Sequence, residues 1–101
     1  MKTYSVMMES GLGPRSGKLQ LSEGNGTVAG VLSILGCDNP VSGQWIAPCM
    51  MQLSHNVQTC MNTFFCKTTL CFHGNSFTGT MIMNQTAIEL NGTLMTAEVS
   101  H

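Results

Sequence analysis

The chain repeats itself at an offset of 49 residues, and no other feature limits its fold as strongly. The segment VAGVLSILGCDNPVSGQW, which begins at Val28, aligns with FTGTMIMNQTAIELNGTL, which begins at Phe77. Within this alignment two glycines match glycines, and apolar residues match apolar residues at alternate positions. Self-similarity at a fixed period is typical of a structure made of repeated units. We therefore predict two related halves, about 1–50 and 51–101, that arose by duplication.

Halving this period to about 24 or 25 residues gives a weaker match that divides the chain into four units. Each unit consists of a predicted strand, a tight connection and a return strand. The equivalent first-strand positions are Tyr4, Val28, Leu53 and Phe77, and the equivalent second-strand positions are Lys18, Gly43, Lys67 and Gly92. Four consecutive hairpins of this kind give eight strands in meander order.

Apolar and polar residues alternate with period two along much of the chain, and Gly, Asn and Thr interrupt every candidate helix. The alternating segments are YSVM, KLQL, TVAGVLSI, MMQLSHNV, TTLCF, FTGTMIM, AIEL and TLMTAEV, separated by the turn-like GLGPRSG, EGNG, GCDNP, HGNS and NG. The sequence thus predicts one all-β domain spanning 1–101. We expect an eight-stranded antiparallel up-and-down (meander) barrel built from four hairpin repeats with pseudo-twofold duplication, because closure removes exposed sheet edges. A sandwich of two sheets made from the same hairpins is the alternative.

Alternation also predicts which side chains face the lumen of such a barrel. On the first strands this face carries Tyr4, Val6 and Met8; Val28, Gly30, Leu32 and Ile34; Leu53, His55 and Val57; and Phe77, Gly79, Met81 and Met83. His55 is the polar residue that the repeat places on this apolar face, at the position equivalent to Gly30 and Gly79. A buried neutral histidine either has satisfied ring nitrogens in the core or serves a ligand or a proton transfer.

The two glycines allow two interpretations, since glycine in a strand marks either coiling of the strand or the close approach of another group. If they leave space beside His55, the lumen can hold a small ligand. The chain has nine methionines, whose flexible side chains suit an adaptable pocket as well as an ordinary core. The predicted ligand-binding residues are His55, Tyr4, Gly30, Trp45, Phe77, Gly79 and Met81.

In strand count and connectivity this pattern resembles the calycin-like meander barrels, the class of the lipocalins and avidins. The lipocalin entry motif and the tryptophan-rich avidin motifs are not present. The phrases G-x-L-x-x-L-G-x-x-N-P-x-x-G, beginning at Gly30, and L-x-G-T, beginning at Leu90, are also similar to a small uncharacterised β-domain of anaerobic bacteria. This second resemblance covers most of the chain and implies no activity or site residues.

The stretch CMNTFFCKTTLCFHG packs three cysteines and a histidine into fifteen residues, which raises the question of a metal or redox site. Alternation puts Cys71 and His73 on one face of a strand and Cys66 on the other, so one strand cannot bring them to one ion. A site assembled across turns, with Cys37 and Cys60 near one rim, is the alternative. We predict no metal site, no cofactor and no catalytic residue, and interpret the cysteines as small core or rim hydrophobes.

Charged residues make up only 9% of the chain, against roughly 25% in an average globular protein. So weakly charged a surface favours self-association, and we expect a homo-oligomer. Four cations, Lys2, Arg15, Lys18 and Lys67, cannot form a basic patch for nucleic acid or an anionic membrane. Carboxylates lie in or beside predicted turns or on outward positions, where a solvated surface role is expected: Glu9, Glu23, Asp38, Glu89 and Glu98.

Three hypotheses about function remain open at this point. The first is a small barrel that binds an apolar or mixed small molecule in its lumen, with His55 as the polar contact. The second is a structural or interaction module that forms homo-oligomers or docks to an enzyme. The third is a barrel isomerase that uses His55 as acid or base. The first residues lack the apolar run of a signal peptide, so we expect a cytoplasmic protein.

Overall fold

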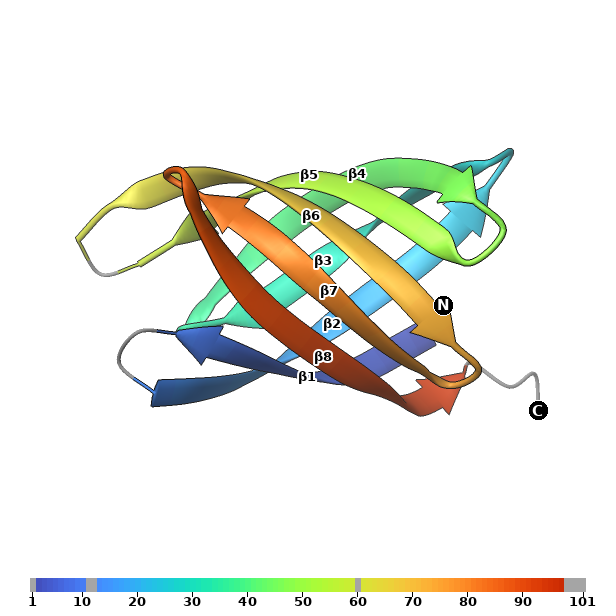
Figure 1. Ribbon diagram of the computed structural model, residues 1–101, viewed down its shortest axis with the longest axis horizontal. Coiled ribbons are helices and arrows are strands. Elements are labelled where there is room, and N and C mark those ends of the chain that lie inside the picture. Colours follow the sequence, from blue (N-terminus) through green and yellow to red (C-terminus); the bar gives the residue numbers. More distant parts are fainter. Residues whose placement is uncertain (1, 11–12, 60, 98–101) are drawn as a thin grey trace.

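The computed structural model of the chain describes residues 2–10, 13–59 and 61–97 (Figure 1). They form a closed barrel in which each strand pairs antiparallel with the next along the chain and the last strand returns to the first. The strands are β1 (Lys2–Ser10), β2 (Gly13–Gly24), β3 (Thr27–Ile34), β4 (Cys37–Ala47), β5 (Met50–Gln58), β6 (Thr63–His73), β7 (Ser76–Met83) and β8 (Thr86–Ala97). The predicted all-β up-and-down barrel is confirmed, and closure between β8 and β1 excludes the two-sheet sandwich.

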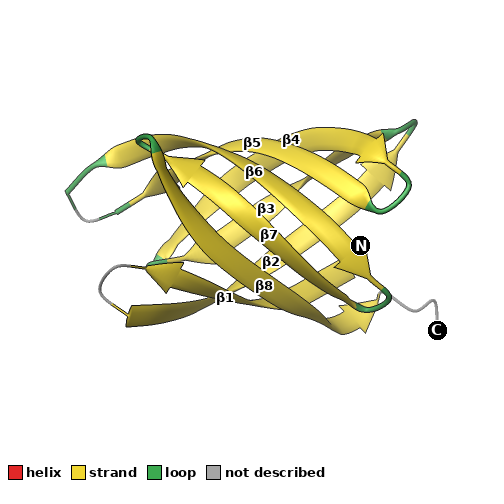
Figure 2. Ribbon diagram, in the orientation of Figure 1, coloured by secondary structure: helices red, strands yellow, loops and turns green. Residues whose placement is uncertain are grey.

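Strands account for nearly all of the described chain, with short loops between most of them (Figure 2). Within these residues there is no helix long and apolar enough to cross a lipid bilayer. Strand bounds in the two halves correspond closely: β3 and β7 begin and end 49 residues apart, and β4 and β8 begin 49 residues apart. The strand spacing is compatible with the predicted repeat, whose origin by duplication stays a prediction.

In each hairpin, a lumen-facing residue of the first strand pairs with the residue fifteen positions later. These pairs are Tyr4–Leu19, Val28–Gly43, Leu53–Thr68 and Phe77–Gly92. The predicted equivalence of Lys18 and Lys67 to the two glycines is therefore wrong by one residue. Leu19 and Thr68 are buried and both lysines are exposed, because a shift of one residue moves a side chain to the opposite face of a sheet.

Two-residue turns close several of the hairpins. Asn25 and Gly26 have φ angles of 53° and 81°, and Leu35 and Gly36 have φ angles of 56° and 79°. Left-handed backbone at both central positions is typical of a type I′ turn, which matches the twist of the flanking strands. Such turns need few residues, so the strands run further than predicted.

Three of the predicted turns are thus wrong in extent. The described part of GLGPRSG belongs to β2, CDNP begins β4, and the Asn91–Gly92 pair lies inside β8. AIEL and TLMTAEV are consequently parts of a single strand as far as Ala97. Exposed polar residues such as Ser16, Asp38 and Asn91 lie on the outer face of these strands, which explains the turn-like composition, whereas Asn39 is buried.

Side chains from all eight strands fill the barrel interior, and the predicted lumen faces are found there. The core residues include Val6, Leu32, Leu53 and Met81, each no more than 4% exposed. No cavity of ligand size opens among them: the space beside His55 is about 10 Å³. The middle of the barrel is therefore a packed core.

Two glycines on the inner face mark places where other groups come very close. A Cβ atom on Gly30 would overlap the backbone carbonyl of Gln20 on the neighbouring strand. A Cβ atom on Gly92 would overlap the far end of the Phe77 ring. Glycine is required at these positions because another strand or ring approaches closely. The space that glycine leaves is therefore filled by the protein itself.

Candidate functional site

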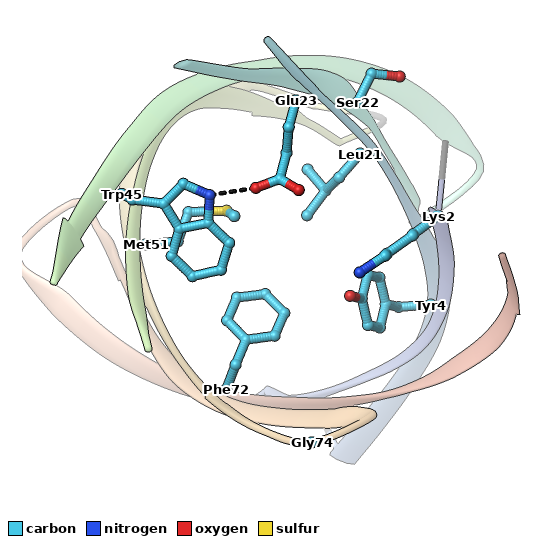
Figure 3. Close-up of a pocket in the computed structure, with 9 residues that line it drawn as sticks. All are labelled: Lys2, Tyr4, Leu21, Ser22, Glu23, Trp45, Met51, Phe72 and Gly74. Atoms are coloured by element: carbon cyan, nitrogen blue, oxygen red, sulfur yellow. Dashed lines mark hydrogen bonds between the residues drawn. The ribbon is translucent and has the colours of Figure 1, made fainter. Parts of the chain in front are cut away.

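A pocket of about 340 Å³ opens at the end of the barrel where β1 begins (Figure 3). Its lining comes from five strands and one turn, and comprises Lys2, Tyr4, Leu21, Ser22, Glu23, Trp45, Met51, Phe72 and Gly74. We call it the open-end pocket. Leu21 and Met51 are 5% and 1% exposed, so the pocket has a buried apolar floor on the packed core.

Strand alternation explains how these side chains reach the pocket. Tyr4 begins the buried series of β1, and Lys2 lies two residues before it on the same face. On β2 the inner face runs from Leu19 through Leu21 to Glu23 at the strand end. The inward-facing residues at these strand ends therefore surround the opening of the pocket, while those further along the strands form the core.

The walls of the pocket are aromatic. The ring centroids of Trp45 and Phe72 lie 5.3 Å apart, and those of Phe72 and Tyr4 lie 5.8 Å apart. Phe77 is 1% exposed and packs against both Tyr4 and Phe72, at 5.2 and 5.3 Å. These tilted and edge-to-face contacts hold the rings in fixed positions. The pocket is thus bounded by an ordered group of rings whose faces border open space.

Trp45 is positioned by a hydrogen bond and by the local backbone. Its indole Nε1–H donates to the carboxylate of Glu23, which lies beside it at the mouth of the barrel (Figure 3). The pairing of β4 with β5 shifts register between Trp45 and Ala47, and such a bulge re-aims the side chain beside it. Glu23 is solvent-exposed, as predicted, but β2 carries it on its inward-facing side, where it accepts this bond from Trp45.

Tyr4 lies on the opposite side of the pocket from Trp45, and Lys2 lies beside Tyr4 (Figure 3). Burial, and secondarily the negative charge of Glu23, raise the pKa of the Tyr4 hydroxyl above its ordinary value. The phenol therefore keeps its proton at neutral pH and offers both a donor and an acceptor.

His55 lies in the packed middle of the barrel, away from this pocket. It is 5% exposed, with Nε2 2.7 Å from the Thr68 hydroxyl and Nδ1 3.3 Å from the Asn56 carbonyl. A carbonyl only accepts, so Nδ1–H donates to Asn56 and the neutral Nε2 accepts from Thr68. Burial lowers the pKa of the imidazole, partly offset by the bond to Asn56. Both nitrogens are satisfied within the protein.

The structure separates the predicted ligand-binding residues into groups. Tyr4 and Trp45 line the open-end pocket, with Phe77 packed behind Tyr4. Met81 and His55 border the 10 Å³ space in the core, and Gly30 lies against the neighbouring strand. Finally, Gly79 faces the neighbouring strand and the buried Leu70 side chain, which leave no room beside it, and its backbone borders a groove on the outer surface with Thr78 and Thr80.

Sequence reasoning missed Glu23, Phe72 and Lys2, all of which line the open-end pocket. The signal was present in the alternation: each continues the inner face of its strand by one more step of two. Lys2 and Glu23 are charged and lie near strand ends. We assumed that strand ends are solvated surface, so the position of both residues on the inner face was not recognised.

The cysteines are dispersed as alternation predicts. Cys66 is fully buried on the inner face, where its thiol lies 3.6 Å from the Phe64 carbonyl, and burial raises the pKa of this thiol. Cys71 lies on the outer face and Cys49 is exposed. Cys60 and Glu98 lie outside the described residues. Within the described residues there is no group of three or more histidine, cysteine or acidic side chains that could hold a metal ion.

The fold and the site together define a closed up-and-down β-barrel with an aromatic pocket at one end. No family model matches the chain, and no curated protein matches it. Among solved structures, the chain is similar to one described as a redesigned beta barrel, mFAP1, bound to DFHBI. The TM-score is 0.67 and the identity 14%, over 91% of this chain and 90% of that chain. At this identity the likeness shows the fold, and membership of the calycin-like or uncharacterised bacterial groups stays a prediction.

Proposed function

We propose that the protein binds a small, largely apolar ligand with a flat ring in the open-end pocket. The observation that carries this proposal is a 340 Å³ pocket with three aromatic walls over a buried apolar floor. That volume lies at the lower end of the roughly 300–1,000 Å³ typical of small-molecule sites. The solved barrel of similar fold is described as bound to DFHBI, which supports the proposal at the level of fold only.

The proposed ligand position differs from the one expected from the sequence. A ligand in the middle of the lumen would have to displace core side chains around His55, where only about 10 Å³ is free. At the open end, a ring can lie against Trp45 and Phe72 without displacing any buried group. Stacking of this kind contributes roughly 0.5–1.5 kcal/mol per ring pair beyond burial of area.

Trp45 is the sole tryptophan of the chain, so its indole N–H gives one identifiable signal in an amide correlation NMR spectrum. We expect small aromatic fragments such as benzyl alcohol to shift this signal and the amides of Glu23 and Gly74. Amides of the packed middle, such as Leu32, should not move. A panel of aromatic fragments that leaves the Trp45 signal unchanged would argue against binding at this end.

The chain offers a matched pair of variants for this test. Phe72 and Phe64 lie on the same strand and face, at opposite ends of the barrel, and both are partly buried. Phe72→Leu should weaken fragment binding severalfold, since it removes one aromatic wall. Phe64→Leu should leave binding unchanged, and equal effects of the two variants would contradict the proposed site.

A second proposal is self-association through the outer face of β6 and β7. Phe65 and Ile82 are 61% and 46% exposed, and Ile82 pairs with Lys67, two residues along β6 from Phe65. Large apolar side chains adjacent on an outer sheet surface are suited to contact with a second copy. Light scattering should show that Phe65→Ser combined with Ile82→Thr lowers the mass of an oligomer. Ile46→Thr, at a residue of similar exposure on β4, is the control, and a monomeric parent protein would end this proposal.

A further inference from the structure

Two opposite charges face the open-end pocket from different sides. Glu23 projects from the end of β2 beside Trp45, and the Lys2 side chain projects from the start of β1 beside Tyr4 (Figure 3). Among the residues drawn in Figure 3, the one hydrogen bond joins Trp45 to Glu23, and no interaction joins Glu23 to Lys2. The two charges therefore remain available to a third group placed between them.

Glu23 retains acceptor capacity after its bond to Trp45. A carboxylate has two oxygens with about four acceptor sites, and the indole N–H uses one of them. The other described residues provide no further donor to this carboxylate. A ligand N–H or ammonium that enters the pocket thus finds an acceptor already held in place by Trp45.

Lys2 provides the complementary group. Its ammonium has three donors and no acceptor, and the neutral Tyr4 hydroxyl lies beside it as a second polar group. A carboxylate or another anionic acceptor is the partner that such a pair favours. Both charges are solvent-exposed, and a wholly apolar ligand would offer neither of them a partner in place of any water that it displaces.

On the basis of the ligand-binding function proposed above, we infer that the pocket selects a dipolar aromatic compound. Its ring lies between Trp45, Phe72 and Tyr4, its N–H or ammonium group meets Glu23, and its anionic acceptor meets Lys2. Opposite charges on either side of one apolar site fix the orientation of the ligand as well as its identity. The same arrangement disfavours neutral rings and singly charged rings, each of which leaves at least one protein charge unpaired.

The test compares four benzene-ring probes that differ in charge: 4-(aminomethyl)benzoate, benzylamine, benzoate and benzyl alcohol. Each is titrated into the full chain at neutral pH and low salt, with the Trp45 indole signal as readout. We expect the dipolar probe to bind about tenfold more tightly than benzyl alcohol, through two charge-assisted contacts. Its 3-substituted isomer is included to vary the distance between the charged groups.

Two variants assign the contacts. Glu23→Gln should weaken the dipolar probe and benzylamine while sparing benzoate, and Lys2→Gln should weaken the dipolar probe and benzoate while sparing benzylamine. Glu9→Gln and Lys18→Gln, at charges outside the open-end pocket, serve as controls and should change nothing. If all four probes bind equally, or if both pocket variants act alike on all of them, the dipolar inference is overturned and the binding function stands. If no probe moves the Trp45 signal, both fail.

Discussion

The two ends of this barrel finish the same alternating pattern in different ways. At the end opposite the pocket, Asn39 is 3% exposed and its amide is fully engaged. Nδ2 donates to the carbonyls of Leu32 and Cys37 at 3.1 and 3.3 Å, and Oδ1 accepts from the Gln58 amide at 2.9 Å. At the pocket end, Glu23 lies at a comparable inward-facing position, and among the described residues it accepts a hydrogen bond from Trp45 alone.

The difference between the two ends follows from how costly each inward-facing polar side chain is to bury. A short neutral amide can satisfy backbone groups of neighbouring strands, so Asn39 can be buried at its end of the barrel. A longer ionised carboxylate is costly to bury, so the end around Glu23 stays open to water. The aromatic rings beside it then become walls instead of core.

The largest expected effect compares two phenylalanines that touch each other. Phe77→Ala should lower the free energy of unfolding by about 3–5 kcal/mol, since Phe77 is fully buried. Phe72→Ala should cost only about 1–2 kcal/mol, because part of that ring already borders open space. Urea denaturation measures both. If Phe77→Ala does not fold, the Leu variants give the same ranking, and equal costs would mean that the open end is packed like the core.

The polar residues at the two ends should differ in the same direction. Asn39→Ala should destabilise the protein by about 1–3 kcal/mol, because it removes a buried amide and leaves the partly buried backbone N–H of Gln58 without its acceptor. Glu23→Ala should change stability by no more than about 0.5 kcal/mol, since water can replace its exposed contact. Thermal and chemical unfolding of the two variants would show whether the buried amide of Asn39 stabilises its end of the barrel as described. A larger loss for Glu23→Ala would reverse our account of the two ends.

His55 in the packed middle should make stability depend on pH. Its pKa is lowered in the folded state, so between that value and the ordinary 6.5 the unfolded chain binds the extra proton. Stability should therefore fall as pH drops below about 6.5, by at most about 1.4 kcal/mol per pH unit from this one group. Unfolding of the parent protein and of His55→Gln across this range gives the difference due to His55. Parallel pH profiles would contradict it.

The smallest effect concerns turns at opposite ends. Leu35, in the turn at the end opposite the pocket, has a left-handed φ of 56°, which is unfavourable for a branched apolar residue. Leu35→Asn should stabilise the protein by about 0.5–1 kcal/mol, while Leu35→Ala, which keeps the strain, should not. The reverse exchange, Asn25→Leu at the open end, should cost a similar amount. Calorimetry of the three variants would test this, and a destabilised Leu35→Asn would show that the Leu35 side chain has a packing role.

The fold could be predicted from the sequence because alternation and repetition act along whole strands. Buried residues such as Val6, Leu32 and Leu53 belong to long alternating patterns on their strands, so an error in one or two turn boundaries does not change the predicted fold. Register was less secure, since Lys18 and Leu19 are neighbours and a single position decides which is buried. Turn boundaries failed where outward polar residues, as at Asn91, have the same composition as loops.

The site was only half visible in the sequence. Tyr4 and Trp45 could be identified because aromatic residues on an inner face suggest a lining. Glu23 could not be separated from surface carboxylates without knowing that β2 carries its inner face as far as that residue. The state of the lumen depends on side-chain packing around His55 across several strands, and no local pattern contains that information.

The pairing of β1 with β8 has a consequence for the connectivity of the chain. Lys2 and Ala97, near the two ends of the described chain, are register partners. A short peptide linker from Ala97 to Lys2 would therefore connect the described strands into one continuous ring, and the two-residue turn between β4 and β5 is a natural place for new chain ends. Such a circular permutant would interchange the two halves in sequence while keeping every strand pair. It would make β5 the first strand and leave Trp45 four residues from the new carboxyl end.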